Sequence, residues 1–328
     1  MSALVDFQFR FRVYNHTVII EKLSLIEENF IMRKVKIITD SCADLGAKLL
    51  EKYDIDYVKM ATIEDGVESP ALITWTNEEA HILYDKIRAG KRITTAQVSV
   101  EEFQTVFTKY VEEGYDIVYV ACSSKQSGSV NTGFVTAKKV MEEHPDAKIF
   151  CIDSLNTSIG EGLLSIEAAK LAAEGKSAEE IAEYITSIRN NVLEFITVHS
   201  LDTLRRAGRV SATSAFFGNL MGVKPVLIAD AIGAQAAYKK VKGRMPAIKE
   251  CIKLMKENII EPEKQTVYLW HSDCDPEELA IVLQLVKDEI PCKEIEIGII
   301  GPIVGASVGP SVVGVFAMGK EVTFVAEG

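Results

Sequence analysis

Residues 116–134 read DIVYVACSSKQSGSVNTGF, and this stretch decides the fold class. Its first half is a run of apolar residues, which is typical of a strand buried on both faces. Its second half changes abruptly to serines, an asparagine and a threonine around Gly128, and a helical pattern follows. A strand that passes through a short turn into a helix is the repeating unit of an α/β protein. The hydroxyl-rich turn also indicates a candidate binding loop.

The same alternation of strand and helix patterns extends from about residue 35 to the end of the chain. Apolar strand patterns joined by helices predict a parallel sheet covered on both faces. The glycine-rich residues 301–319 then precede one more expected strand. We expect a boundary near residues 155–165 without a flexible linker, and an N-terminal extension over residues 1–31. The sequence therefore predicts an α/β fold, with domains at 32–158 and 159–328.

Composition excludes several classes of protein. The 328 residues carry a net charge of −11, with 48% hydrophobic and 25% charged residues. Nucleic-acid binding usually requires a basic surface, so no nucleic-acid partner is expected. Anionic membranes would repel the chain on average, which leaves only transient membrane contact through a local patch. No apolar run approaches the ~20 residues of a membrane span, and the N-terminus lacks a signal-peptide pattern.

The cysteines and nucleotide motifs point to no metal and no cofactor. The six cysteines form no CxxC pair and match no zinc-site spacing. Such cysteine usage fits a reducing compartment, so a cytoplasmic location is expected. No lysine lies in the GxxxxGK[ST] pattern that binds nucleotide phosphates.

Hydroxyl-bearing and other polar side chains follow four successive predicted strands. Ligands in α/β sheets bind beyond the carboxyl ends of strands, and hydroxyls beside helix N-termini suit a modest anion such as a carboxylate. The alternative is that these residues only cap helices and close turns. The set comprises Thr39, Asp40, Ser41, Thr94, Thr95, Gln97, Ser99, Ser123, Ser124, Ser127, Ser129, Asp153, Ser154, Thr157 and Ser158.

Other polar residues give weaker signals. Arg209 follows Gly208 in RRAGRVS, where a turn could direct its guanidinium onto a carboxylate or phosphate; a solvated helix end is the alternative. His199 and His271 each end an apolar strand, where a structural role is favoured over a catalytic one. No GxSxG or HExxH motif occurs, so we assign no catalytic residue.

Seven motifs in order resemble the DegV family of bacterial fatty-acid-binding proteins, which includes the lipid-carrier subunit of fatty acid kinase. They are ITDSCADL, TTAQVS, SSKQSGSVNTG, DSLNTSIGEGLL, LDTLRRAGRVS, KPVL and GPIVGASVGP. The resemblance covers the chain from about Met32 to its C-terminus. It implies two α/β domains with a long-chain fatty acid in a cleft between them, and a carrier that is not itself an enzyme.

The resemblance also assigns roles to residues. It implies that Thr95, Ser127 and Ser129 bind the carboxylate of the fatty acid, with Ser129 in place of the family's threonine. It places Arg209 near the head group and puts Ser307 at the position of a family histidine. From its place at a strand end, we also predict His271 in the head-group vicinity. For the acyl tunnel we predict Ile159 and Leu163 together with the apolar residues Phe216, Phe217, Leu220 and Met221. The family's carrier presents its acid to a separate ATP-binding kinase subunit, which forms an acyl phosphate.

The chain departs from the family pattern at three places. Residues 95–99 lack the usual serine and proline, Ser307 stands where a histidine is frequent, and residues 243–246 read GRMP instead of Gly-Arg-Thr-Arg. These departures leave the kinase role open. Two alternatives also remain: a hydrolase or transferase for a small acyl or phosphorylated substrate, and a lipid-responsive regulatory protein without a kinase partner.

Overall fold

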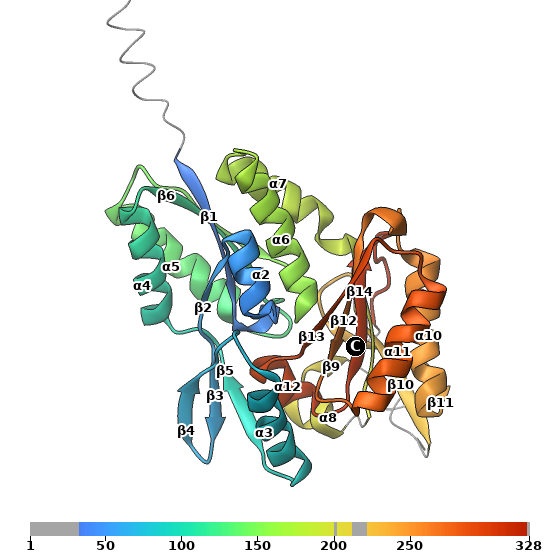
Figure 1. Cartoon of the computed structure of the whole chain (residues 1–328). Coiled ribbons are helices and arrows are strands. Elements are labelled where there is room, and N and C mark those ends of the chain that lie inside the picture. The colour runs from blue at the N-terminus through green and yellow to red at the C-terminus, as the bar shows by residue number, and fades with distance from the viewer. Residues whose placement is uncertain (1–32, 200–201, 212–221, 327–328) are drawn as a thin grey trace, which may run out of the picture.

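The computed structural model describes residues 33–199, 202–211 and 222–326, which form two α/β lobes (Figure 1). The first lobe is built on a four-stranded sheet in the order β2-β1-β6-β7, and every neighbouring pair is parallel. This arrangement confirms the predicted N-terminal parallel sheet. Its strands are β1 (Lys34–Asp40), β2 (Asp56–Val58), β6 (Tyr115–Ala121) and β7 (Ile149–Asp153).

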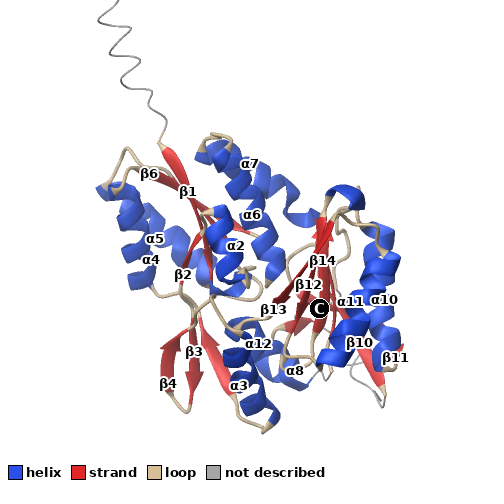
Figure 2. Cartoon of the chain, viewed as in Figure 1, coloured by secondary structure: helices blue, strands red, loops and turns tan. Residues whose placement is uncertain are grey.

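Helices cover both faces of this sheet (Figure 2). Ile117 and Tyr119 of β6 pack toward one layer of helices, whereas Val118 and Val120 pack toward the other. All four side chains are fully buried, which explains the uninterrupted apolar run of the opening stretch. The first layer comprises α4 (Val100–Glu112) and α5 (Ser129–Glu143), and the second comprises α2 (Gly46–Tyr53), α6 (Ile159–Ala173) and α7 (Ala178–Ile188).

The second lobe contains a seven-stranded mixed sheet in the order β13-β12-β14-β8-β10-β11-β9. The helices α10 (Arg244–Asn258) and α11 (Pro276–Glu289) contribute to the core on one face. The expected last strand lies earlier than predicted, because it forms within the glycine-rich residues 301–319. The strands are β8 (Val192–Thr197), β9 (Val210–Ser211), β10 (Val223–Ala229), β11 (Gln235–Lys242), β12 (Thr266–His271), β13 (Glu294–Ile299) and β14 (Val313–Met318).

Helix α6 lies between the two sheets. It packs on β1 and β6 of the first lobe and also contacts β8 and β14 of the second. Ile159 is completely buried and Leu163 nearly so, within a core that both lobes share. The lobes are therefore joined by packing on both sides of residue 158, and the assignment of 32–158 and 159–328 to separate domains stays a prediction.

A small antiparallel sheet extends from the first lobe, in the order β4-β3-β5 (Figure 1). Residues 55–63 are expected to form one strand, but the chain bends between β2 and β3, where the Met60 N–H donates to the Ser41 hydroxyl at 3.0 Å. Helix α12 of the second half packs on this sheet and on α3, so the two lobes interlock. The elements are β3 (Ala61–Glu64), β4 (Val67–Pro70), β5 (Ile93–Ala96), α3 (Asn77–Arg88) and α12 (Pro302–Val308).

Among the described residues, no helix combines the length and the hydropathy that a bilayer span requires.

Candidate functional site

A cavity of about 290 Å³ lies where the two lobes meet. Its wall combines apolar side chains with hydroxyls and amides, and among its lining residues within the described ranges Arg209 carries the one charged side chain. The residues come from the loops after β1, β6 and β7, from β5 and β11, from α12, and from α8 (Asp202–Ala207) with the segment after it. The lining residues are Cys42, Met60, Thr95, Gln97, Cys122, Gln126, Ser127, Gly128, Thr157, Leu204, Arg209, Gln235, Ile303, Val304, Ser307 and Val308.

The cavity brings Thr95 and Ser127 together from different sheets. Ser127 follows β6, at the carboxyl edge of the parallel sheet where a ligand site is expected. The sequence suggested that Thr95 also follows a strand of that sheet. Instead, Thr95 lies within β5 of the small antiparallel sheet. The cavity therefore forms between two sheets and not along a single sheet edge.

Ser129 supports the cavity from behind. Its side chain is completely buried and is not part of the lining. Its hydroxyl lies 2.9 Å from that of Ser127 and accepts from the Val98 N–H at 3.2 Å, which ties the β6 loop to the segment after β5. Ser129 also begins α5, a 15-residue helix whose N-cap Gly128 has no side chain to occupy the free N–H groups. The positive end of this helix dipole therefore faces the cavity.

Three of the other hydroxyls link segments that are far apart in the chain. Thr39 is buried and donates to the Val120 carbonyl at 3.1 Å, and Ser41 donates to the Ala71 carbonyl at 2.7 Å. Ser123 donates to the Gly233 carbonyl of the second lobe at 2.7 Å. Of the loop after β7, Thr157 lines the cavity. The sequence pattern identified loops that border the cavity, but it could not separate the hydroxyls that line the cavity from those that hold the loops in place.

Arg209 and Ser307 line the cavity, whereas His271 does not. The Arg209 guanidinium donates to the Gln126 carbonyl at 3.0 Å and to the Ala207 carbonyl at 2.9 Å, which links the basic turn to the β6 loop. His271 accepts from the Cys274 N–H at 3.3 Å, and burial lowers its pKa below the usual range. These contacts give His271 a structural role in the turn after β12.

Three glutamines line the cavity, and two of them were missed from the sequence. Gln97 belongs to the loop that the sequence singled out, but Gln126 and Gln235 carry no motif of their own. The Gln235 amide donates to the buried carboxyl of Glu194 at 2.9 Å, which fixes its orientation. Burial raises the pKa of Glu194 to about 7. Only the pairing of β11 with its neighbours brings Gln235 to the site.

The predicted acyl-tunnel residues divide into two groups. Ile159 and Leu163 are core residues of α6 and are not part of the cavity lining. The apolar wall consists of other residues: Met60, Leu204, and Ile303, Val304 and Val308 of α12. Phe216, Phe217, Leu220 and Met221 lie outside the described residues.

A second hollow of about 340 Å³ adjoins the cavity and shares Thr95, Arg209 and Ser307 with it. We call this hollow the basic vestibule, because its lining includes the cations Lys91, Arg92, Arg206 and Arg209. Such a cluster is notable on a chain with a net charge of −11, and it makes this opening attractive to anions.

The buried Asp44 carboxyl holds the two lobes together beside the cavity. The Asp44 carboxyl accepts from the Gly301 N–H at 2.8 Å and from the Ser158 hydroxyl, while the Trp270 indole donates to the Asp44 carbonyl at 3.0 Å. Burial raises the pKa of Asp44 to about 7, although these hydrogen bonds to its carboxyl lower it. These contacts join the turn after β1 to the turn before α12.

The arrangement can bind and orient an anion with an apolar tail. The hydroxyl of Ser123 bonds to the Gly233 carbonyl and that of Ser127 to Ser129, so within the described ranges neither serine has a histidine as hydrogen-bond partner.

The comparison with known families agrees with this geometry. The model of the DegV family, described as uncharacterised proteins, matches residues 34–320. The chain belongs to the DegV family. A DegV domain-containing protein of Clostridium perfringens is 34% identical over 290 residues, which cover 88% of this chain and 98% of the relative. A second one, from Streptococcus pyogenes serotype M3, is 31% identical over 285 residues, covering 87% of this chain and 98% of the relative.

Solved DegV structures share the fold. A DegV lipid-binding protein of Thermotoga maritima has a TM-score of 0.76 and 28% identity, with 88% of this chain and all of that one covered. A stearic acid-binding protein of Eubacterium ventriosum has a TM-score of 0.76 and 26% identity, with 87% and 98% covered. A DegV protein of Thermus thermophilus, described as binding fatty acid, has a TM-score of 0.76 and 25% identity, with 88% and 100% covered. The two-lobe α/β fold predicted from the sequence is thereby confirmed.

Proposed function

We propose that this protein binds a long-chain fatty acid, with the carboxylate held in the cavity between its lobes. The observation that carries the proposal is the meeting of Thr95, Ser127 and the amino end of α5 in one cavity with an apolar wall. Solved DegV proteins that share the fold bind fatty acids, which supports the same ligand class here.

The apolar tail supplies most of the binding free energy. Each buried methylene contributes about 0.8 kcal/mol, so about twelve of them contribute roughly 10 kcal/mol before the costs of ordering. Loss of translation and chain ordering removes several kcal/mol of this gain. The described cavity, at about 290 Å³, is near the lower end of small-molecule sites, which span roughly 300–1,000 Å³.

The carboxylate determines the orientation of the ligand. A buried carboxylate is costly unless hydrogen bonds compensate for the lost water. Thr95, Ser127 and the free N–H groups at the start of α5 provide neutral donors, and Arg209 lies at the border with the basic vestibule. Neutral donors hold the acid without a tight ion pair, so its oxygens remain available for reaction.

Two measurements test the proposal. Native mass spectrometry of the purified protein should show one co-purified long-chain acid per chain. After delipidation, titration with the free acid and with its methyl ester should give clearly tighter binding of the acid, because the ester lacks the anionic oxygen. Equal affinities would contradict the carboxylate cradle, and the absence of any binding of the acid would refute the proposed function.

We further propose that the protein presents the bound acid to a separate ATP-dependent kinase subunit, which converts it to an acyl phosphate. The basic vestibule supports this proposal, because it borders the cavity and its cations suit a phosphoryl group, although one of the four, Lys91, already pairs with Asp65. Ser307, in place of the histidine frequent in the family, lies between the two hollows.

The kinase proposal predicts that a substitution can lower acyl-phosphate formation without changing the affinity for the fatty acid. With a purified kinase subunit, Arg206→Gln should lower acyl-phosphate formation while leaving the affinity for the free acid unchanged, because Arg206 lines the vestibule and not the cavity. Lys287→Gln on α11 serves as the control for a general loss of positive charge. Acyl-phosphate formation that is absent with wild-type protein, despite normal binding of the acid, would favour a lipid-responsive regulatory role.

A further inference from the structure

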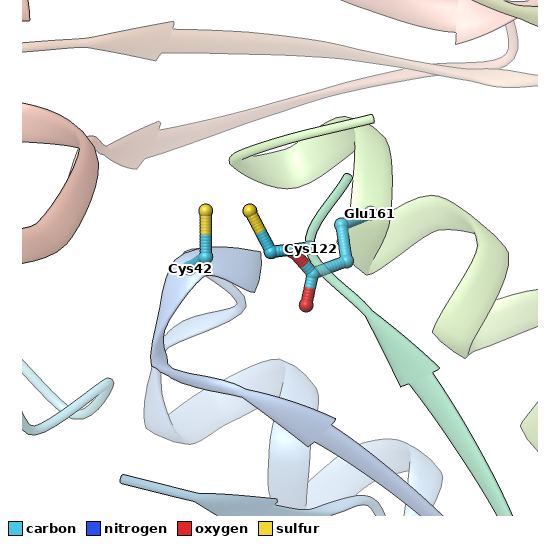
Figure 3. A group of neighbouring side chains, drawn as sticks. All are labelled: Cys42, Cys122 and Glu161. Carbon is cyan, nitrogen blue, oxygen red and sulfur yellow. The ribbon is translucent and has the colours of Figure 1, made fainter. Parts of the chain in front are cut away.

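A compact group of potential metal ligands lies at the wall of the cavity, although the sequence shows no metal-site spacing. Cys42 follows β1 and Cys122 follows β6, and the fold of the parallel sheet brings these turns together. One ligand atom each from Cys42, Cys122 and Glu161 lies within 4.8 Å of the other two, and all three side chains are buried. Figure 3 shows the two sulfurs side by side and pointing in the same direction, with Glu161 reaching toward Cys122 from α6.

The Glu161 carboxyl has an unused ligand position. Its Oε1 accepts from the Thr39 hydroxyl at 2.7 Å and from the Asp40 N–H at 3.5 Å. Its Oε2 is buried and has no hydrogen-bond partner among the described residues. Glu161 is completely buried and forms no ion pair with a described residue, so this oxygen lacks a donor or a cation. An unsatisfied buried oxygen costs free energy, which a bound cation would recover.

The two thiols are in contact and protonated when no cation is present. The contact with Cys122 and burial both raise the pKa of Cys42 well above its usual range. For Cys122, the contact with Cys42 lowers the pKa, but burial and the neighbouring Asp40 and Glu161 carboxyls outweigh it and raise the pKa to about 12. A thiophilic cation would displace both protons, as it does when it binds cysteine thiols in other proteins.

We propose that Cys42, Cys122 and Glu161 form a binding site for a thiophilic divalent cation of the Zn²⁺ class. Two sulfurs and one carboxylate oxygen provide three ligands, and sulfur ligands favour such ions over Mg²⁺ or Ca²⁺. Cys42 and Cys122 also line the cavity, so an ion has an entry path. Loading one Zn²⁺ releases the two thiol protons and the proton of the buried Glu161 carboxyl, and leaves two metal–thiolate bonds and one metal–carboxylate bond.

A second group of potential ligands does not support a comparable site. His81, Asp85 and Asp273 also approach one another, but His81 and Asp85 are exposed and Asp273 is only partly buried. The Arg88 guanidinium already contacts Asp85 at 2.8 Å and Asp273 at 2.6 Å, so their negative charge is compensated. This group provides a control for metal binding through nitrogen and oxygen alone.

The test uses reduced, delipidated full-length protein and Co²⁺ as a spectroscopic substitute for Zn²⁺. We expect one Co²⁺ per chain with a thiolate-to-cobalt charge-transfer band that Zn²⁺ abolishes by displacement. Cys42→Ser and Cys122→Ser should each lose this band. Cys151→Ser, which alters a cysteine of β7 outside the group, and His81→Ala should retain it.

Glu161→Gln tests the third ligand separately. It should weaken Zn²⁺ binding by roughly tenfold or more, because replacing a residue that only hydrogen-bonds to a metal ligand typically weakens binding by that much. Thermal unfolding of each variant identifies any general loss of the fold. The site is refuted if the wild-type protein shows no charge-transfer band at stoichiometric Co²⁺, or if the band persists in Cys42→Ser. The wild-type measurement does not depend on the folding of any variant.

Discussion

Ser127 shows how a hydroxyl in a loop comes to line the cavity. Its side chain lines the cavity, and its neighbour Ser129 fixes its position from the buried side. Ser124, three residues earlier in the same loop, is exposed and does not line the cavity. The two serines have the same chemistry, so only their positions in the fold separate their roles.

We therefore predict that Ser127→Ala weakens fatty-acid binding by about 1–3 kcal/mol, the cost of a buried acceptor left without a donor. Ser124→Ala is the matched control and should leave the affinity unchanged. Calorimetric titration of both delipidated variants provides the measurement. Wild-type affinity in Ser127→Ala would show that this hydroxyl does not contact the carboxylate.

Protonation of the buried Glu194 makes the free energy of unfolding depend on pH. Its pKa in the folded protein is about 7, above the ordinary value of 4.5 that it regains on unfolding. Between these two values the folded form holds a proton that the unfolded form has released, so the free energy of unfolding falls as the pH rises through this window. The total effect is about 3 kcal/mol as an order of magnitude.

Glu194→Gln should remove this dependence and make the variant more stable than the wild type at pH 8. The carboxamide oxygen that the substitution introduces can still accept the hydrogen bond from Gln235, so the cavity wall is preserved. Chemical denaturation at pH 5 and pH 8 measures the effect, and the exposed Glu179→Gln is the control. Parallel pH profiles for wild type and Glu194→Gln would contradict the assignment.

At the scale of elements, α12 decides the shape of the cavity. It contributes four lining residues, and its Gly305 packs directly on α3. A Cβ added at Gly305 would lie 2.4 Å from the Tyr84 hydroxyl. Tyr84 is fully buried and donates to the Ile300 carbonyl at 2.6 Å, so it cannot move aside easily.

Gly305→Ala should therefore displace α12, destabilise the protein by about 1–3 kcal/mol through overpacking, and weaken fatty-acid binding. Adding Tyr84→Phe removes the closest atom and should restore part of the loss, although the Ile300 carbonyl then lacks its donor. A double-mutant cycle on unfolding free energies measures this coupling. Strictly additive effects would show that the two positions do not clash.

The elements themselves were largely predictable, for a local reason. The capping residue Ser99 accepts from the Glu102 N–H, as its spacing predicts. The Glu102 carboxylate does not complete the expected capping box with Ser99; it accepts from the Lys59 N–H at 3.0 Å. A helix start depends on neighbouring residues, whereas the partner of a long side chain depends on what the fold brings near.

At the scale of the whole molecule, the cavity wall is divided between the lobes. Ser127 belongs to the first lobe, and Gln235 and Ser307 to the second. The Asp44 contacts and the hydrogen bond from Ser123 to the Gly233 carbonyl hold these two surfaces in place against each other. Gly233 has a φ of +83°, and a Cβ there would lie 2.3 Å from the Ser123 hydroxyl, so the close approach requires glycine.

A ligand bound between lobes should stabilise the whole fold. At a free fatty-acid concentration of one hundred times Kd, the unfolding free energy should rise by about 2.7 kcal/mol. Thermal unfolding of delipidated protein with and without added acid measures this shift. The methyl ester at the same concentration is the control, and equal shifts for acid and ester would contradict recognition of the carboxylate.

The sequence by itself determined the α/β class, the parallel first sheet and the loops that carry the site. Apolar periodicity, capping residues and hydroxyl-rich turns are local, and strand ends in a parallel sheet converge on one edge. Tertiary structure alone decided which hydroxyls face the ligand, that β5 leaves the sheet, that Gln235 enters the cavity wall, and that Cys42 lies against Cys122. These are contacts between residues far apart in the chain, and no local pattern encodes them because each depends on which strands pair and on how the two lobes pack together.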